Sequence, residues 1–338
     1  MKYGKNGVLY SFGGNMACSI LLGAGFSRNW GGWLGAEAFE YLLGCPEVKS
    51  SPTIKELLWG FSEVGGFECA LAELHSRARL DHGRYNADLQ SLEGAVQNMF
   101  KAMNHCMSRL TNFDLGLGNG SVRKFLGRFD AIFTLNQDLL LEYQYLQRWD
   151  GVELPGMRLS SSAGPHPCGT PWTEQWIPTK ESEFRVTAHR QPCFKLHGSS
   201  NWLEGVGGSL LIAGGENARK LGLPPVLDWY HRQFAHYVSR ANHNLMIIGY
   251  GFRDIYINEV IAQAVAENGL RLFVISPEGS SAASRASLSA GLGQEGGSAI
   301  DEAFRRGLVG ASRRRLNEIF TEREPMELKK VLRFLEAD

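Results

Sequence analysis

The sequence has few cysteines, and they are not paired. Six cysteines occur among 338 residues, and no Cys-x-x-Cys spacing is present. Disulfide-stabilised secreted domains are far denser in cysteine, and structural zinc sites usually present their ligands in closely spaced pairs. We therefore expect reduced thiols, most of them buried, and no metal site.

Long hydrophobic runs are also missing. No window approaches the roughly 18 uninterrupted apolar residues that indicate a membrane-spanning helix. The first apolar run, Ile20 to Leu22, is too short for the hydrophobic region of a signal peptide. These absences predict a soluble, cytoplasmic protein without a membrane partner.

Net charge is the third absence, because 35 lysines and arginines balance 35 aspartates and glutamates. A formal charge of zero gives no molecule-wide field that would attract nucleic acid. The Arg313–Arg315 run lies in a tail of mixed charge and fits a solvated helical face. We therefore expect no direct nucleic-acid binding.

Glycine and apolar residues, in contrast, are plentiful. The chain has 40 glycines and is 43% hydrophobic, which excludes a disordered protein and provides material for a core. Its length suits one large domain or two ordinary ones. Glycine is used where the backbone bends sharply or approaches a ligand closely, so the places where glycines gather indicate candidate sites.

Short apolar runs, each ending in a turn signal, are typical of buried strands in a parallel sheet. There are five, at Ala17–Leu22, Asp130–Leu135, Phe194–Leu196, Asn244–Ile248 and Arg271–Ile275. Helical patterns separate the later strands, at Val226–Arg240 and Ile255–Glu267. This alternation predicts an α/β fold, a parallel β-sheet with helices on both faces.

The first two strands are separated by about a hundred residues with helical spacing of apolar side chains. The helical patterns are at Pro52–Phe61, Glu68–Arg79 and Asp88–Leu110. They predict a large helical insertion at about residues 35–127.

Three later segments lack the strand pattern. Residues 151–192 are rich in Pro, Gly and Ser and predict a long ordered loop. Gly279–Ser298 is dense in Gly, Ser and Ala and predicts a mobile loop or a disordered break, whereas Asp301–Asp338 predicts two helices. We accordingly divide the chain into a core at 1–278, a flexible loop at 279–299 and C-terminal helices at 300–338.

Polar or glycine-rich turns follow four of the predicted strands. These turns are Gly23–Arg28, Asn136 with Asp138, His197–Ser199 and Gly249–Gly251. Because the carboxyl ends of parallel strands share one edge, the turns are expected to converge on a ligand crevice. Each turn also has a structural interpretation: a tight strand-to-helix turn, a helix cap, or a histidine that only satisfies the core.

The same residues carry a resemblance to the sirtuin superfamily, most closely to its bacterial sirtuin-like branch found in antiviral defence systems. The matching motifs are Gly23-Ala24-Gly25-Phe26-Ser27, Thr134-Leu135-Asn136-Gln137-Asp138, Lys195-Leu196-His197-Gly198-Ser199 before Asn201-Trp202, and Gly249-Tyr250-Gly251-Phe252-Arg253-Asp254. Order and strand context match from about residue 17 to 277. The second motif departs from the commoner Thr-Asn-Tyr-Asp form at two positions but keeps Asn136 and Asp138.

The resemblance implies a Rossmann-like fold that binds NAD across the sheet edge. The implied NAD-binding residues are Gly23, Ala24, Gly25, Phe26, Ser27, Arg28, Gly198, Ser199, Gly249, Tyr250, Gly251 and Ser276. The implied catalytic residues are Asn136, His197 and Asp138. Asn136 would orient a water or the ribose hydroxyls, and His197, with an ordinary pKa near 6.5, would accept a proton. Asp138 would stabilise cationic charge or cap a following helix at Leu139–Gln147, the cap being slightly favoured.

The choice of nucleophile decides the reaction. Lysine-deacylating sirtuins carry a zinc module with two cysteine pairs, which is absent here, since Cys168 and Cys193 alone cannot build a four-ligand site. The resemblance therefore implies that water attacks and that NAD⁺ is hydrolysed to nicotinamide and ADP-ribose, with cyclisation of ADP-ribose left open. The alternatives are a non-catalytic NAD or ADP-ribose-binding module and, less favoured, an NAD-dependent lysine deacylase.

The defence branch also implies control by other proteins. Such a chain would be a homo-oligomer regulated by a partner, for example a HerA-class DNA-translocating ATPase or a short Argonaute. The histidines outside the motifs lack ligand spacing, since His231 and His236 are five positions apart on a predicted helix and do not share a face. We expect them to have structural or surface roles.

Overall fold

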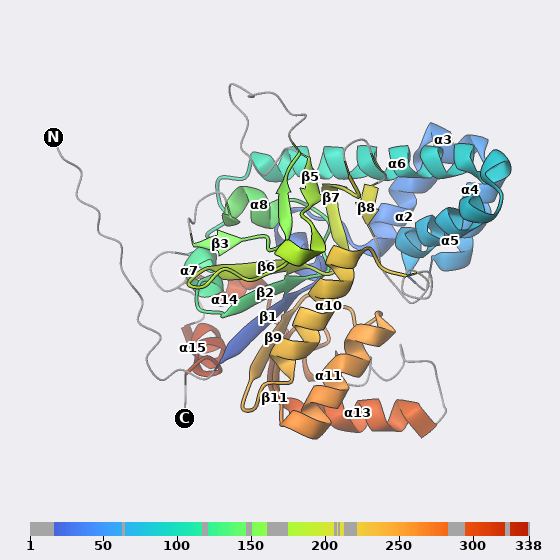
Figure 1. The fold of residues 1–338 in the computed structure, drawn as a ribbon. Helices are drawn as coiled ribbons and strands as arrows, with labels where there is room; N and C mark the ends of the chain where they lie inside the picture. Colours follow the sequence, from blue (N-terminus) through green and yellow to red (C-terminus); the bar gives the residue numbers. More distant parts are fainter. Residues whose placement is uncertain are drawn as a thin grey trace.

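The structure is a computed structural model, and it describes residues 17–62, 65–116, 121–146, 151–160, 175–205, 208, 210–212, 222–282, 295–321 and 325–336. A seven-stranded sheet in the order β11-β10-β9-β1-β2-β6-β3 forms its centre, and all of its strand pairs are parallel (Figure 1). The strands are β1 Cys18–Leu22, β2 Ala131–Thr134, β3 Val152–Glu153, β6 Gln191–Lys195, β9 Asn244–Ile248, β10 Arg271–Ile275 and β11 Leu308–Ser312. The predicted α/β fold with a parallel sheet is confirmed.

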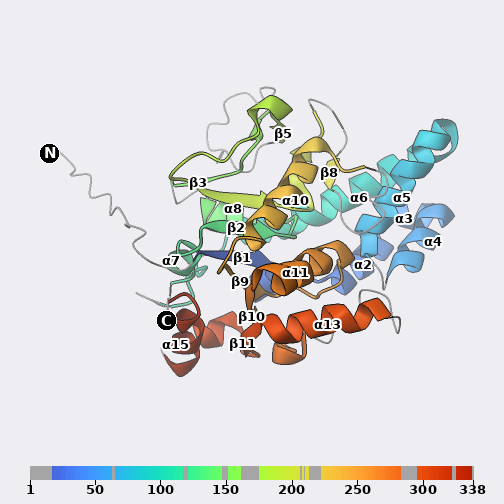
Figure 2. The ribbon, with the colours of Figure 1, turned by 60° about the horizontal axis from the view of Figure 1, so that its bottom comes forward.

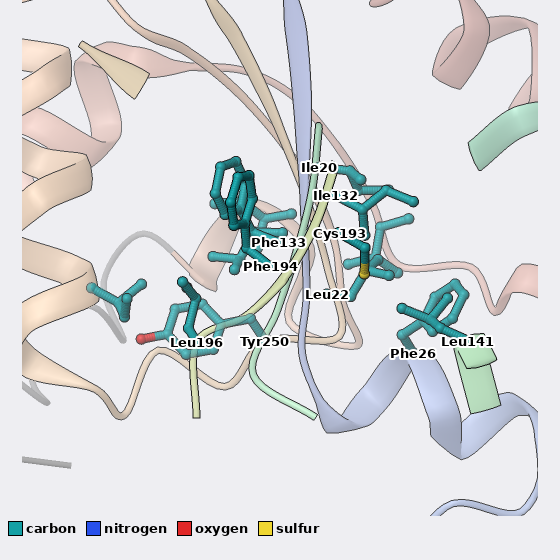
Figure 3. Close-up of a cluster of buried hydrophobic side chains, with 14 of the residues drawn as sticks. Ile20, Leu22, Phe26, Ile132, Phe133, Leu141, Cys193, Phe194, Leu196 and Tyr250 are labelled. Carbon is teal, nitrogen blue, oxygen red and sulfur yellow. The ribbon is translucent and has the colours of Figure 1, made fainter. Parts of the chain in front are cut away.

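The two faces of the sheet carry separate halves of the core (Figure 3). On one face the stacked rings of Phe133 and Phe194, 5.1 Å apart, meet Phe234 of helix α10 (Pro225–Val238). On the other face Ile132 and Cys193 lie beside each other in register and are fully buried. Because neighbouring residues of a strand point to opposite faces, near-continuous apolar runs are what a sheet covered on both sides requires.

Helices cover both faces. Helices α10 and α11 (Ile255–Asn268) lie on the Phe133 face, and α13 (Glu295–Gly307) runs alongside α11 (Figure 2). Helices α1 (Ala24–Ser27) and α8 (Leu140–Gln144) lie on the opposite face, where they contribute Phe26 and Leu141 (Figure 3). This arrangement follows from the direction of the connections, since right-handed crossovers in opposite directions along a sheet put their helices on opposite faces.

The predicted insertion between β1 and β2 is helical, and the residues described there contain no strand. Its helices are α2 Gly35–Gly44, α3 Pro46–Ser50, α4 Pro52–Phe61, α5 Gly66–Leu80, α6 His82–Ser108 and α7 Val122–Leu126. Ser51 caps α4 by accepting a hydrogen bond from the Ile54 N–H at 3.1 Å, and Pro52 occupies the first turn, as capping rules predict. Helix α6 is 27 residues long and crosses the top of the molecule (Figure 1).

The prediction of a loop over 151–192 is wrong in part. This segment contains β3, β4 (Met157–Leu159) and β5 (Trp176–Pro178), and a second sheet has the order β4-β5-β7-β8. Its other strands are β7 Gly198–Leu203, which begins inside a motif interpreted as a turn, and β8 Leu210–Ile212. Strands of two or three residues bury too few side chains to produce an apolar pattern. Cys168 lies outside the described residues.

The C-terminal segment also departs from the prediction of two helices. It contains α14 (Leu316–Ile319), α15 (Pro325–Arg333) and the last residues of α13. Helix α13 itself begins at Glu295, inside the segment predicted to be a mobile loop or a disordered break. Strand β11, which was not predicted, adds the edge of the central sheet. It is largely half-buried, so it lacks a continuous apolar run. The sheet therefore extends past residue 278, the predicted end of the core.

Among the described residues no helix is both long enough and apolar enough to cross a membrane. The structure describes five of the six cysteines. Cys18, Cys45, Cys69 and Cys193 are buried, and Cys106 is exposed.

Candidate functional site

The glycine turn after β1 packs directly on the turn after β9. Gly23 N–H donates to the Ile248 carbonyl at 2.9 Å, and Gly25 N–H donates to the Gly249 carbonyl at 2.8 Å. A Cβ on Gly249 would lie 2.2 Å from the Phe26 nitrogen, and the Gly249 φ is +64°. The contact between the two backbones therefore requires glycine at position 249, whatever contact this turn makes with a ligand.

This contact lies at the topological switch point of the sheet. From β1 the chain proceeds to β2 on one side, whereas β9, on the other side of β1, is reached by a crossover in the opposite direction. Ligands of open α/β sheets bind outside the carboxyl ends of the strands at such a point. The two glycine turns thus border the position that the fold offers to a dinucleotide.

Asn136 links the glycine turn to the strand next to it. Its Nδ2 donates to the Gly23 carbonyl and to the Ser27 hydroxyl, each at 3.0 Å, and both side chains are buried. Its backbone N–H donates to the Thr134 hydroxyl at 3.1 Å. The predicted site residues after β1 and β2 are therefore held together by direct hydrogen bonds. Ala24 is half-buried beside them, and Arg28 is exposed and paired with Glu37.

His197 is buried between two carboxylates. Its Nε2 lies 3.0 Å from Asp254 Oδ2, and its Nδ1 lies 3.4 Å from Glu68 Oε2. Burial alone would lower the pKa of His197, but the charge of Glu68 and the hydrogen bond of Asp254 outweigh burial and raise this pKa to about 10. Burial would likewise raise the pKa of Asp254, and the hydrogen bond from His197 lowers it. In this arrangement the ring is an imidazolium at neutral pH, so it is not the free base with a pKa near 6.5 that was expected.

Asp138 interacts with the start of the next helix. Its Oδ1 accepts a hydrogen bond from the Leu140 N–H at 3.0 Å, two positions along the chain, which is the local turn expected of an aspartate before a helix. The N-cap residue of α8 is Leu139, so Asp138 forms a local turn just before the helix, which ends at Gln144 and is shorter than predicted. The Asp138 carbonyl also accepts from Lys195 Nζ at 2.6 Å, and Lys195 pairs with Glu142 at 2.6 Å in the interior.

Residues 130–294 match the family model of the SIR2-like domain. No curated protein matches the chain. The matched segment contains Asn136, His197 and Asp254, whereas the glycine turn at 23–28 precedes it. The match shows that this segment is similar to the SIR2-like domain, and it is consistent with an NAD-related function.

The residues at the sheet edge fit part of what NAD needs. The Asn136 amide, the Ser27 hydroxyl and the His197 ring can hydrogen-bond ribose hydroxyls, and two glycine turns allow close approach of a diphosphate. The Gly25 and Phe26 N–H groups are bonded to Gly249 and Gly23 carbonyls, so they do not face outward as free anion donors. The side chains at this sheet edge are therefore better placed to hydrogen-bond NAD than the backbone N–H groups of the glycine turn are.

The remaining predicted residues have mostly structural contacts in this arrangement. A Cβ on Gly198 would lie 2.0 Å from the Leu211 carbonyl oxygen, and Ser199 Oγ lies 3.4 Å from the Gln137 carbonyl. Ser276 is buried after β10, and its N–H donates to the Ser312 carbonyl at 3.1 Å. Gly251 has open space around its Cα, where the nearest atom to a Cβ would be 4.0 Å away.

Tyr250 positions the segment that follows it. Its hydroxyl donates to Asn258 Oδ1 at 3.0 Å and accepts from the Asp254 N–H at 3.2 Å. Asp254 in turn caps α11 by accepting from the Ile257 N–H at 3.1 Å. Tyr250, implied to line the nucleotide, therefore fixes the backbone that presents Asp254 to His197.

Sequence reasoning missed the two carboxylates that hold His197. Asp254 was quoted in a motif without a role, and its position just before a helix was an available signal. Glu68 gave no signal, because its role depends on α5 folding back over the sheet edge. There it also accepts a hydrogen bond from the Gln137 side-chain amide.

The structure also contains a pocket of about 310 Å³, and no residue of the glycine turn lines it. It is lined by Gln97, Phe100, Lys101, Asn104, His105, Ser108, Leu139, Tyr143, Ser200 and Asn201. Asn104, one of the lining residues, accepts from the Leu139 N–H at 2.9 Å and donates to Ser200 Oγ at 3.0 Å. This asparagine therefore braces the chain just after Asn136 to the chain just after His197.

The described part of the chain contains no group of three or more His, Cys, Asp or Glu side chains arranged to hold a metal ion. His231 is buried on α10, and its Nε2 lies 3.0 Å from the Leu196 carbonyl. This contact is the structural role expected for it.

Proposed function

We propose that this chain is an NAD⁺ glycohydrolase that cleaves NAD⁺ to nicotinamide and ADP-ribose. The observation that carries the proposal is the bonding of the Asn136 amide to the glycine turn and to Ser27, at the switch point of a sheet with a SIR2-like segment. A purely structural turn does not need a buried amide and a buried hydroxyl facing each other at the ligand edge.

The side chains at this edge suit the reaction. Nicotinamide leaves as a neutral molecule, so the ribose passes through an oxocarbenium-like state and gains positive charge. The carboxylates of Glu68 and Asp254 provide negative charge near this position, and Asn136 can orient the attacking water or a ribose hydroxyl. In the balanced reaction NAD⁺ and water give nicotinamide, ADP-ribose and one proton. His197 can accept that proton once its ring has released one of the two protons that it holds between Glu68 and Asp254.

Water is the proposed acceptor because the cysteine pairs of the zinc module that lysine-deacylating sirtuins carry are absent from the sequence. The alternatives differ in their products. A lysine deacylase forms O-acyl-ADP-ribose from an acylated peptide, a cyclase forms cyclic ADP-ribose, and a binding module forms nothing.

The test is chromatography of NAD⁺ incubated with the purified chain, alone and with candidate partners. Asn136→Ala and His197→Ala are expected to reduce nicotinamide release by about 100-fold or more. Asn112→Ala and His82→Ala, at exposed positions, are the matched controls and should retain the wild-type rate. Binding of NAD⁺ without nicotinamide release under every condition would favour the binding module and overturn the hydrolase.

We further propose that the activity depletes NAD⁺ in the cytoplasm as the effector of an antiphage defence system, in a homo-oligomer activated by a HerA-class ATPase or a short Argonaute. The motif resemblance supports this role, and the helical insertion has apolar side chains suited to a partner, with Trp59 61% and Leu80 87% exposed. Co-expression with each partner during phage infection, with NAD⁺ measured in wild-type and Asn136→Ala cells, tests it. An equal NAD⁺ content in both strains would contradict the effector role.

A further inference from the structure

We propose that Asp254 is the positioning residue of His197 and that Glu68, carried by the helical insertion, is a removable cap on the other ring nitrogen. Helix α5 would then decide whether His197 can accept a proton. This proposal rests on the proposed hydrolase function for its meaning, but its central measurement needs no NAD⁺. We call the arrangement Glu68–His197–Asp254 the carboxylate clamp.

The Asp254 side of the clamp is rigid. While Oδ2 holds His197 Nε2 at 3.0 Å, Oδ1 accepts from the Ile257 N–H in the first turn of α11. The turn before it contains Phe252 at φ +54°, a strained conformation for a residue other than glycine, and its carbonyl accepts from Asn258 Nδ2 at 2.9 Å. Asp254 cannot leave His197 without disturbing the start of α11.

The Glu68 side of the clamp is held differently. Glu68 lies in the first turn of α5, and two consecutive glycines with positive φ, Gly65 at +80° and Gly66 at +58°, begin this helix. Its distance to His197 Nδ1 is longer, 3.4 Å, and its side chain is 19% exposed, against 10% for Asp254. Its polar contacts with His197 and Gln137 join the insertion to the sheet edge. A shift of the start of α5 would therefore remove Glu68 and leave Asp254 in place.

The clamp assigns different roles to the two ring nitrogens. Asp254 keeps a proton on Nε2, so Nδ1 is the nitrogen that can accept one, and Glu68 occupies its hydrogen-bonding direction. When Glu68 leaves, Nδ1 can release its proton to solvent. In the reaction it then takes a proton from the attacking water as the water oxygen bonds to the ribose carbon. The C–N bond breaks at the same time, and its electron pair leaves with nicotinamide.

Besides Glu68, His197 and Asp254, His231 is a titratable side chain that acts on the clamp. His231 on α10 lies behind the Leu196 carbonyl, and its positive charge, when present, acts on Asp254 and lowers the pKa of that carboxyl. Gln137, after β2, is neutral and touches Glu68. Glu68 and Asp254 are thus the two negative groups in contact with the ring, and removal of the Glu68 charge should change the titration of His197.

The experiment is an NMR titration of ¹³C-labelled histidine in the full chain, with the His197 signal assigned from its loss in His197→Gln. Glu68→Gln is expected to lower the pKa of His197 by about 1 to 3 pH units, the usual effect of a neighbouring charge. Glu73→Gln, on the same helix but paired with Arg77 at 2.7 Å, is the matched control and should leave the titration unchanged. An identical His197 titration in wild type and Glu68→Gln would overturn the clamp.

The pH dependence of turnover separates the two carboxylates. Glu68→Gln should shift the acid limb of the kcat/KM profile to lower pH and raise turnover at neutral pH. Asp254→Asn, which can still cap α11, should lower kcat about 10-fold or more at every pH, because His197 loses its orientation. If no variant releases nicotinamide, the proposed function fails, and the NMR titration still decides the clamp.

Discussion

Asn136 donates its side-chain amide to the hydroxyl of Ser27 at 3.0 Å, across 109 positions of sequence. Ser27 precedes the segment that matches the SIR2-like domain, and Asn136 lies within it. The hydrogen bond therefore joins the glycine turn, which lies outside the matched segment, to the end of β2, which lies inside it.

The contact predicts an effect of Ser27→Ala. Without the hydroxyl the Asn136 amide loses one of two partners and its fixed orientation, so nicotinamide release should fall about 10-fold or more, while stability falls by about 1 kcal/mol. Nicotinamide assays and urea unfolding measure the two effects. Ser280→Ala, at an exposed serine, should change neither, and an unaffected Ser27→Ala enzyme would show that this hydrogen bond has no role in the reaction.

The two glycines of the turn after β9 should respond differently to alanine. Gly249→Ala places a Cβ 2.2 Å from the Phe26 nitrogen at φ +64°, so it should destabilise the fold by more than about 1 kcal/mol. Gly251→Ala meets no atom closer than 4.0 Å and should stay within about 0.5 kcal/mol of wild type. Urea midpoints measure both. If Gly251 contacts NAD, its variant will bind NAD more weakly with stability intact; equal stability of both variants would contradict the loop contact.

The buried pair Lys195–Glu142 predicts a stability effect inside the Lys-Leu-His-Gly-Ser motif. Both side chains are 2% exposed, so Lys195→Met leaves an unpaired carboxyl in the interior at a cost of about 3–5 kcal/mol. The double variant Lys195→Met/Glu142→Leu removes both charges and should recover most of that loss. Chemical unfolding of the two variants measures this; no recovery in the double variant would mean that Lys195 stabilises the fold mainly through the Asp138 carbonyl.

The carboxylate clamp also predicts how stability depends on pH. The folded pKa of His197, about 10, exceeds its ordinary value of 6.5, so the stabilisation is complete below about pH 6.5 and is lost as pH rises toward 10. Melting temperatures between pH 7 and 10 should therefore fall more steeply in wild type than in His197→Gln. Parallel curves for the two proteins would contradict an ionised clamp.

The parts of the fold that could be predicted are those whose residues are buried on both faces of the sheet. Strands β9 and β10 begin and end at the predicted residues, because every position in them contributes to an apolar run or its flank. Strands β3 and β11 lie at the two edges, and β11 is largely half-buried, so neither has such a run. The apolar pattern of a sequence reflects which side chains are buried. Edge strands bury too few side chains to produce a pattern that can be recognised.

The site was predictable to the same extent. The convergence of the turns after β1, β2, β6 and β9 followed from parallel strands alone, and the hydrogen bonds of Asn136 and the burial of His197 are consistent with it. The partners were not predictable, because Glu68 reaches His197 only through the packing of the helical insertion. For the same reason the pKa of His197 could not be anticipated from its sequence neighbours.

The most direct test of the account is the quantification of nicotinamide and ADP-ribose after NAD⁺ is incubated with wild type and with Asn136→Ala, alone and with candidate partners. The account predicts equal amounts of nicotinamide and ADP-ribose from wild type under at least one of these conditions, and loss of about 100-fold or more in Asn136→Ala. Bound NAD⁺ that stays intact under all of these conditions, or equal turnover by the two proteins, would contradict it.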